Sequence, residues 1–232
     1  GGRGAPPINQ VIYGQEEAKF LVPARVFENS LGQCLPTVAT WARPELTAGY
    51  LPRGLRGDDI WCQLFSEPAA GSDTGGIRTR AERDGDEWII NGQQVWTSGA
   101  HFCDYGILLA RSDWDQPKQK GLTMFILDLK SPGVETRPIH QMSGEREFCE
   151  VFLSDVRIPD SDRLGEVDDG WTIGTRWMYH ERLGHNSPYV TTPVGLKGEQ
   201  QHGPSVVGIA RDAGRLDDPA ALELIGEHRA LD

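Results

Sequence analysis

The sequence predicts an α+β protein in which an antiparallel β-barrel or sandwich lies between two partial α-helical domains. Two observations support this prediction. Short apolar runs separated by turn residues fill residues 61–156, and apolar residues at helical spacing lie before and after them. We therefore expect a partial N-terminal helical domain at residues 1–58, a middle β-domain at 59–165 and a partial C-terminal helical domain at 166–232.

The first region contains three expected helices. Apolar residues from Ile8 onward follow an amphipathic pattern to Val22, and Pro23 ends it. A second short helix is expected within residues 31–41, and the family resemblance described below implies a helix followed by a loop within residues 44–55.

The middle region contains five strand-like runs, at residues 88–90, 105–110, 122–129, 134–139 and 148–156. The turn residues Asp84-Gly85-Asp86 precede the first run. Asn91-Gly92 follows it and is a strong hairpin signal. These turns indicate a sheet of short strands joined by tight connections.

Two polar segments flank the first of these strands. The first reads Ser66-Glu67-Pro68-Ala69-Ala70-Gly71-Ser72-Asp73. In it Pro68 fixes φ and lacks a donor, and Gly71 permits backbone conformations that other residues avoid. Such a loop leaves backbone N–H groups and hydroxyls pointing outward, which suits the polar or anionic edge of a large ligand.

The second segment reads Asn91-Gly92-Gln93-Gln94-Val95-Trp96-Thr97-Ser98. Trp96 can cover the face of a planar ring system, and the Ser98 hydroxyl can bond a heteroatom at its edge. In the alternative interpretation, Pro68 and Gly71 merely turn the chain and Trp96 fills a core.

Composition narrows the classes of partner. The chain has 232 residues and a formal net charge of -11, which argues against nucleic acid and anionic membrane surfaces. The four cysteines are scattered without a C-x-x-C pair, and no histidines have zinc-ligand spacing, so no metal site is expected. The apolar runs are too short to cross a bilayer, and no signal peptide is evident. We expect buried, reduced thiols in a cytoplasmic protein.

A helix is expected from Trp171. Its residues Trp171, Gly174, Trp177, Met178 and Glu181 share one face. Because Glu181 has apolar neighbours one turn back, its carboxylate is suited to general-base chemistry. The alternative is a solvent-exposed Glu181 without a chemical role.

The two polar segments, in this order, resemble the acyl-CoA dehydrogenase family, whose middle domain carries a TEP-x-AGSD loop and a later NG-x-K-x-[WF]-I-[TS] segment. The resemblance implies FAD as cofactor. It implies that Ser72 also lies near a thioester substrate and Ser98 near flavin N5. The flavin contacts that it implies are Gln63, Leu64, Phe65, Ser66, Gly71, Ser72, Trp96, Thr97 and Ser98.

A third match concerns the catalytic base. Met178-Tyr179-His180-Glu181-Arg182-Leu183 resembles the L-x-x-ER pattern of family members that carry the base on the first C-terminal helix. The resemblance implies Glu181 as the base, with Tyr179 and Arg182 as substrate contacts. Most members carry the base in a late loop, which has no counterpart in this sequence.

The resemblance implies oxidation of an acyl-CoA to the 2,3-enoyl-CoA, by α-proton abstraction and hydride transfer to flavin N5. It implies an external electron acceptor such as an electron-transfer flavoprotein, and a homo-oligomer (dimer or tetramer) or hetero-oligomer. Most of the family's C-terminal helical bundle is expected to be missing. The alternatives are an acyl-CoA oxidase, a flavin monooxygenase, or an inactive subunit that supports a catalytic partner.

Overall fold

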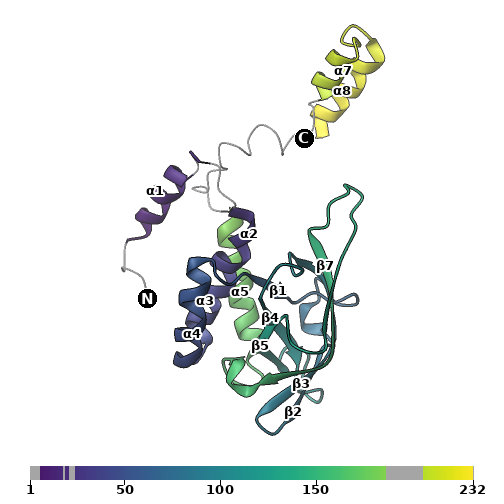
Figure 1. Ribbon diagram of the computed structural model, residues 1–232. Helices are drawn as coiled ribbons and strands as arrows, with labels where there is room; N and C mark the ends of the chain where they lie inside the picture. Colours follow the sequence, from purple (N-terminus) through teal and green to yellow (C-terminus); the bar gives the residue numbers. More distant parts are fainter. Residues whose placement is uncertain (1–5, 18, 21–23, 187–205, 232) are drawn as a thin grey trace. The chain divides into compact units, whose positions relative to one another are not determined.

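The computed structural model describes residues 6–17, 19–20, 24–186 and 206–231. The chain divides into two compact units, one formed by residues 1–22 and 187–232 and the other by residues 23–186. Figure 1 shows the larger unit as a curved sheet with helices beside it. The domain limits expected from the sequence stay predictions.

The smaller unit contains helices α1 (Pro7–Glu17), α7 (Val206–Asp212) and α8 (Pro219–Leu231). Helix α1 ends earlier than the expected Val22, and both Val22 and Pro23 lie outside the described residues. Helix α8 begins at Pro219, whose missing N–H suits the first position of a helix. The Asp218 carboxylate accepts a hydrogen bond of 2.9 Å from the Ala220 amide, as an N-terminal cap does.

The larger unit begins with α2 (Ala24–Asn29), the π-helical turn η1 (Ser30–Cys34), α3 (Leu35–Trp41) and α4 (Pro44–Arg56). Proline in the first turn of α3 and of α4 fits the helix start, because the N–H groups there have no intrahelical partner. Gly57, with φ 77°, ends α4 in the left-handed conformation. The helices expected near residues 31–41 and 44–55 are therefore confirmed.

The sheet has eight strands in the order β6-β7-β3-β2-β4-β5-β8, with β1 paired to β4. Two 3-10 turns, η2 (Thr74–Gly76) and η3 (Asp160–Asp162), interrupt the strand sequence. The strands are β1 (Trp61–Leu64), β2 (Arg80–Asp84), β3 (Glu87–Ser98), β4 (Tyr105–Arg111), β5 (Leu122–Asp128), β6 (Val134–Pro138), β7 (Phe148–Pro159) and β8 (Arg163–Leu164).

The α+β class is confirmed, but the strand pairing differs in detail from the expected antiparallel barrel or sandwich. The hydrogen-bonded path is open, and the β1–β4 and β2–β4 pairs are parallel. A parallel pair needs a long crossover, and residues 65–104 supply it between β1 and β4.

The hairpin signal at Asn91-Gly92 was wrong, because β3 runs through both residues and the β2–β3 turn lies at residues 84–87. The register with β7 shifts between Ile90 and Gly92 instead. The Asn91 side chain exchanges two hydrogen bonds with Asp155, at 3.0 and 2.9 Å. The Asn-Gly pair therefore forms a β-bulge and not a turn.

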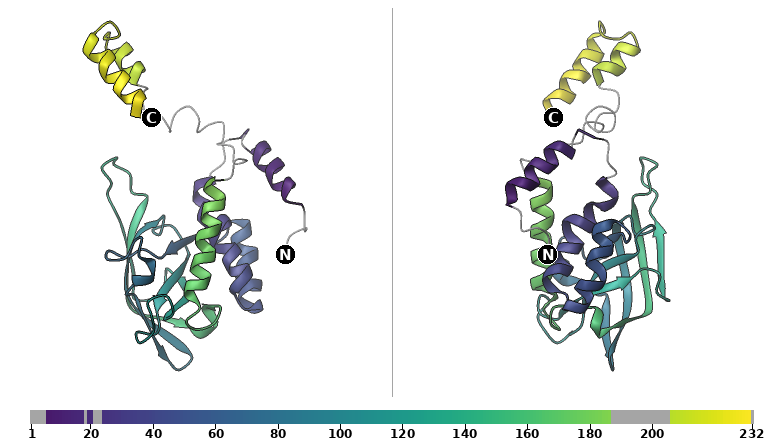
Figure 2. Two further views of the ribbon diagram at one scale, coloured as in Figure 1. Left: turned by 180° about the vertical axis from the view of Figure 1, so that it is seen from behind. Right: turned by 60° about the vertical axis from the view of Figure 1, so that its left-hand side comes forward.

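Strand β4 separates two apolar cores. Leu108 and Ala110 pack among buried residues of β3 and β7, whereas Ile107 and Leu109 pack on the helical side with Trp177. Figure 2 shows α3, α4 and α5 (Gly170–Asn186) together on one side of the sheet. The alternation along β4 thus fixes the helices against the strands that carry the two polar segments.

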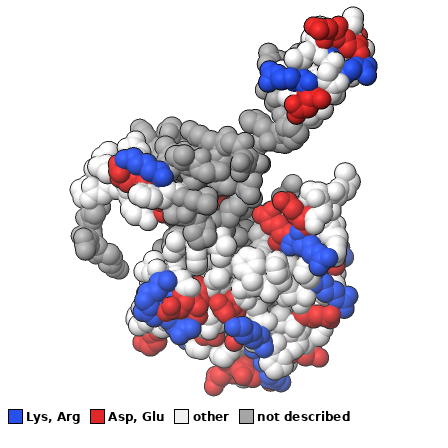
Figure 3. All heavy atoms as spheres, turned by 45° about the horizontal axis from the view of Figure 1, so that its top comes forward, with Lys and Arg blue, Asp and Glu red and all other residues white. Residues whose placement is uncertain are grey.

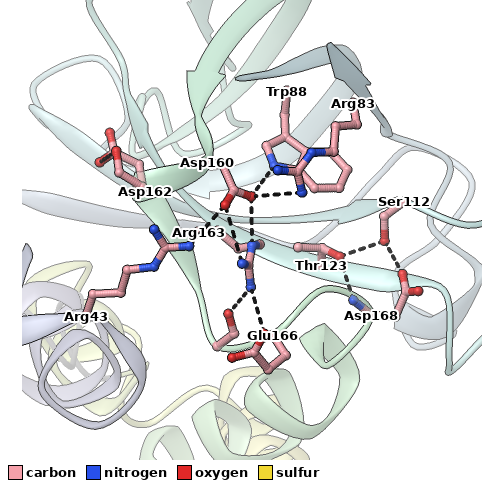
Figure 4. A network of polar contacts seen from close by, with 12 residues as sticks. Arg43, Arg83, Trp88, Ser112, Thr123, Asp160, Asp162, Arg163, Glu166 and Asp168 are labelled. Atoms are coloured by element: carbon pink, nitrogen blue, oxygen red, sulfur yellow. Dashed lines mark hydrogen bonds and ion pairs between the residues drawn. The ribbon is translucent and has the colours of Figure 1, made fainter. Parts of the chain in front are cut away.

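A polar network fastens the α3–α4 connection to the end of β7 (Figure 4). The Asp160 carboxylate accepts hydrogen bonds from Arg163 (3.0 Å), Trp88 Nε1 (2.8 Å) and Arg43 (3.0 Å). The hydrogen bond from Arg163 holds the pKa of this carboxyl well below its ordinary value. All three partners come from different elements, so the network is a structural junction.

The surface carries charges of both signs. On the face shown in Figure 3, Lys and Arg side chains lie interspersed with Asp and Glu side chains. None of the helices in the described ranges has the length and apolar character needed to span a membrane. In the same ranges no three His, Cys, Asp or Glu side chains are grouped to hold a metal ion. The expected burial of the four cysteines is confirmed.

Candidate functional site

The first predicted loop is a tight turn directly after β1. Glu67 and Ala70 exchange two backbone hydrogen bonds, at 3.0 and 3.1 Å, so that the chain reverses over Pro68. Gly71 and Ser72 follow and are exposed. Gly71 does not adopt a positive φ, so the structure does not use the wider range of backbone conformations that glycine permits. A Cβ there would meet nothing within 4 Å, so the glycine leaves open space above the loop.

The structure brings the two polar segments into contact. The Val95 amide donates a 2.8 Å hydrogen bond to the carbonyl oxygen of Ser66. Residues separated by almost thirty positions, with the β2–β3 hairpin between them, thereby form one surface. The two sets of predicted flavin contacts are neighbours.

Trp96 lies at a second irregularity in β3. The register with β7 shifts between Gln94 and Thr97, and Trp96 adopts φ 61°. For a bulky residue this left-handed conformation is a genuine outlier that costs on the order of 1–3 kcal/mol. The bulge turns the indole outward, where it is 58% exposed and packs edge-on against Phe148, with ring centroids 5.9 Å apart. The alternative in which Trp96 fills a core is therefore wrong.

The other predicted contacts differ in what their side chains can reach. Gln63, Ser66 and Ser98 are half-buried, but Leu64, Phe65 and Thr97 are buried. As direct flavin contacts these buried three stay predictions. The Thr97 hydroxyl lacks a hydrogen-bond partner among the residues that the structure describes.

Helix α5 packs against the first loop. The Phe65 and Trp177 rings lie with centroids 5.4 Å apart, and Trp177 is fully buried. Glu181 lies four residues further on, one helical turn or roughly 6 Å along the axis, and is half-buried. Glu181 therefore lies one turn beyond Trp177, the residue of α5 that packs against the predicted flavin contact Phe65.

The two predicted substrate contacts on α5 are less defined. Tyr179 is about half exposed, and the Arg176 guanidinium lies 5.0 Å from the centre of its ring. Arg182 belongs to α5, but its side chain lies outside the described residues. The roles of Tyr179 and Arg182 stay predictions.

A cavity of about 270 Å³ opens beside the second segment. Its lining includes the apolar residues Val26, Trp61 and Phe102, together with Ser98. Glu145 and Glu147, from the β6–β7 connection, also line it, and the Glu147 carbonyl accepts a 2.8 Å hydrogen bond from the Gly99 amide. An apolar group with one polar edge fits such a cavity.

Basic groups lie beside Ser72 although the chain is acidic overall. Lys118 forms an ion pair with Asp73 at 2.7 Å. The Arg111 guanidinium donates hydrogen bonds to the carbonyls of Gly75 (2.5 Å) and Lys118 (2.9 Å). Burial lowers the pKa of Arg111, and the charge of Glu67 opposes that shift. The loop that carries Ser72 thus lies next to cationic side chains.

Comparison with known proteins agrees with this geometry. Residues 62–156 match the family model described as acyl-CoA dehydrogenase, middle domain. The acyl-CoA dehydrogenase FadE34 of Mycobacterium tuberculosis strain H37Rv is 42% identical over 185 residues, which are 78% of this chain and 26% of that protein. This chain belongs to the acyl-CoA dehydrogenase family. The resemblance seen in the two motifs is confirmed.

Two solved structures extend the match. The Tcur3481-Tcur3483 steroid ACAD has 32% identity and a TM-score of 0.70, over 88% of this chain and 51% of that one. A glutaryl-CoA dehydrogenase of Mycobacterium smegmatis in complex with FADH2 has 28% identity and a TM-score of 0.60, over 67% of this chain and 39% of that one. The chain spans between 26% and 58% of the length of the first curated relatives.

The acyl-CoA dehydrogenase family uses FAD, and the residues present here fit that cofactor. Trp96 offers an exposed planar face, and Ser98 follows it by two residues. The open space above Gly71 lets a ligand approach the backbone of the first loop. A flavin needs these features: a flat contact, edge hydrogen bonds and close backbone approach.

Three buried polar residues of this site escaped the sequence analysis as functional candidates. The Glu67 carboxylate, 7% exposed, accepts hydrogen bonds from the amides of Arg78 (2.7 Å) and Thr79 (2.6 Å). Gln94 Nε2 donates to Thr79 Oγ1 at 2.8 Å. Alternation along residues 77–81 carried a usable signal, because Thr79 lies in phase with the apolar Ile77 and Ala81.

Proposed function

We propose that this chain belongs to a FAD-dependent enzyme that converts an acyl-CoA thioester to its 2,3-enoyl-CoA. The observation that carries the proposal is the hydrogen bond from Val95 to Ser66, which joins the two family motifs beside the exposed ring of Trp96. When bound, FAD supplies the acceptor for the β-hydrogen, which leaves as hydride. The residues of the chain bind the flavin, orient the thioester and remove its α-proton.

In the proposed reaction the carboxylate of Glu181 removes the α-proton. Its place on α5 supports this role, because Trp177 of the same helix packs on Phe65 of the flavin loop. A half-buried carboxylate near a water-excluding aromatic pair is suited to proton abstraction. Ser98 and Trp96 hold the edge and face of the flavin ring.

The thioester is proposed to lie between Ser72 and the cavity beside Ser98. Lys118 gives the loop near Ser72 a cation for the phosphates of coenzyme A. The cavity of about 270 Å³ takes an apolar part of the acyl group. Since one similar structure is a steroid ACAD, bulky cyclic acyl groups are included among the proposed substrates.

The proposed enzyme has two kinds of protein partner, an electron acceptor and further subunits. An electron-transfer flavoprotein or a similar external acceptor reoxidises the flavin. The Tcur3481-Tcur3483 structure is named for two components, which supports a hetero-oligomer for this chain; a homo-oligomer is the alternative.

The test is a visible absorption spectrum of the purified protein, with and without added FAD and then with acyl-CoA under anaerobic conditions. We expect a flavin spectrum that bleaches when a suitable acyl-CoA is added. A protein that takes up no flavin, alone or with a partner subunit, contradicts the cofactor proposal. A flavin that stays oxidised with linear, branched and cyclic acyl-CoAs contradicts the proposed reaction.

A further inference from the structure

Thr79 is the centre of a buried polar chain that links the two flavin segments. It is 1% exposed, and its three polar atoms all have partners. Its amide donates to Glu67 at 2.6 Å, its carbonyl accepts from the Arg111 amide at 2.6 Å, and its hydroxyl accepts from Gln94 at 2.8 Å. Glu67 belongs to the first segment and Gln94 to the second.

Strand β3 lies directly against this residue. A Cβ added at Gly92 would fall 2.8 Å from the Thr79 Cα and 2.4 Å from its Oγ1, distances that no side chain tolerates. The glycine that had suggested a hairpin is therefore required by the approach of Thr79. This contact lies between the two register shifts of β3, at Ile90/Gly92 and at Gln94/Thr97.

The second shift contains the strained residue Trp96. Its φ of 61° persists only if neighbouring contacts over-determine the backbone. Two hydrogen bonds precede it in the chain: Val95 N to Ser66 O, and Gln94 Nε2 to Thr79 Oγ1. In the buried interior these hydrogen bonds are costly to break, because breaking one leaves a buried polar atom without a partner.

We propose that Thr79 is a positioning residue, whose hydroxyl fixes the bulge at Gln94 and thereby the orientation of Trp96 over the ligand surface formed with Ser66 and Ser72. The identity of the ligand as a flavin rests on the proposed function. The positioning of Trp96 rests on the hydrogen bonds alone.

The first arm of the test measures flavin affinity in three variants. Thr79→Val keeps the shape and removes the hydroxyl, and we expect affinity to fall about tenfold, as for the loss of one buried hydrogen bond. Thr79→Ser keeps the hydroxyl and should bind within about twofold of the unchanged protein. Thr123→Val is the matched control: this fully buried threonine bonds Ser112 (2.7 Å) and the Asp168 amide (2.9 Å), and its loss should leave affinity unchanged.

The second arm shows whether Thr79 acts through Trp96. In a Trp96→Ala background, Thr79→Val should cause no further loss of flavin affinity, because the residue to be positioned is gone. Additive losses would overturn the proposal. Equal losses for Thr79→Val and Thr123→Val would also overturn it, since they indicate general destabilisation.

The third arm needs no flavin. Amide hydrogen exchange of Val95 reports the hydrogen bond to Ser66, and Thr79→Val should accelerate it at least about tenfold relative to Thr123→Val. An unchanged exchange rate overturns the positioning role. If the unchanged protein binds no flavin but Val95 exchange responds as expected, the proposed function fails while the positioning of the bulge stands.

Discussion

In the larger unit, the carboxylate of Asp160 accepts hydrogen bonds from three side chains, whereas the polar atoms around Trp96 are incompletely paired. Thr97 Oγ1 and Gln94 Oε1 are buried without a partner in the part of the chain that the structure describes. A network with every acceptor used has no capacity left for a ligand. Buried polar atoms without a partner, such as these two near the exposed ring of Trp96, distinguish this region from the fully paired junction.

Backbone strain sets Trp96 apart from the other described non-glycine residues with positive φ. Asp155 and Asp168 have φ of 49° and 66°, which short acidic residues tolerate. Each is held by local hydrogen bonds, Asp155 to Asn91 and Asp168 to Ser112. Trp96, at 61°, is a bulky residue for which this conformation is unfavourable. Strain without a local reason, on an exposed side chain, indicates the ligand surface.

The largest effect is expected from Glu181, the carboxylate of the proposed active site. Glu181→Gln removes the proposed base while keeping its size, so turnover of acyl-CoA should fall by at least about a thousandfold, with flavin still bound. Anaerobic bleaching of the flavin by acyl-CoA measures this. The control is Glu166→Gln, whose carboxylate is 91% exposed and belongs to the structural junction. Retained bleaching in Glu181→Gln would refute the assignment of the base.

Asp160, the carboxylate of the structural junction, should affect the stability of the fold and not flavin binding. Asp160→Asn breaks partly buried, charge-assisted bonds to Arg163 and Arg43, and we expect the free energy of unfolding to fall by about 2–3 kcal/mol. Flavin affinity should not change. The exposed pair of Asp84 with Arg157 supplies the control, because Asp84→Asn should cost less than about 1 kcal/mol. Equal losses in the two variants would erase the distinction between the regions.

The junction should also depend on pH. Because the folded pKa of Asp160 lies below its unfolded value of about 3.9, its stabilisation is fully present above that pH and is lost as the pH falls toward the folded pKa. The difference in unfolding free energy between the unchanged protein and Asp160→Asn should therefore be constant from pH 7 to about 5 and shrink below about 4. Denaturant titrations across this range measure it. A difference that persists at low pH would show that the carboxylate charge is not its source.

Strand positions were predictable, but irregularities within strands were not. The runs at 105–110 and 122–129 became β4 and β5 because continuous apolar residues are buried on both faces of a sheet. Asn91-Gly92 misled because the same pair suits a turn, a bulge and a close contact, and only the position of Thr79 selects among them. The parallel pairing of β1 with β4 is equally invisible locally, since it joins residues more than forty apart.

In the candidate site, too, local sequence patterns did not show the contacts between distant residues. The motifs located both loops and the helix of Glu181, and the structure brings the loops into contact through Val95 and Ser66. The sequence did not show that Leu64 and Phe65 point into the cores, because a strand of four residues and the residue after it give too little periodicity to define their directions. Thr79 escaped notice because an inward threonine gains meaning only from partners distant in sequence.

The smallest stability effect, and the one of unusual sign, is expected at Trp96. Glycine adopts φ near 60° without strain, so Trp96→Gly should leave the free energy of unfolding unchanged or raise it by up to about 1 kcal/mol, while flavin affinity falls at least about tenfold. Trp114 is the matched control: it is 53% exposed and has no positive φ, so Trp114→Gly should lower stability by about 1 kcal/mol and leave flavin affinity intact. Thermal unfolding and flavin titration of both variants make the comparison. If Trp96→Gly loses as much stability as Trp114→Gly, the backbone at the bulge is not strained, and the contrast between the ligand surface and the junction would then depend on unpaired polar atoms alone.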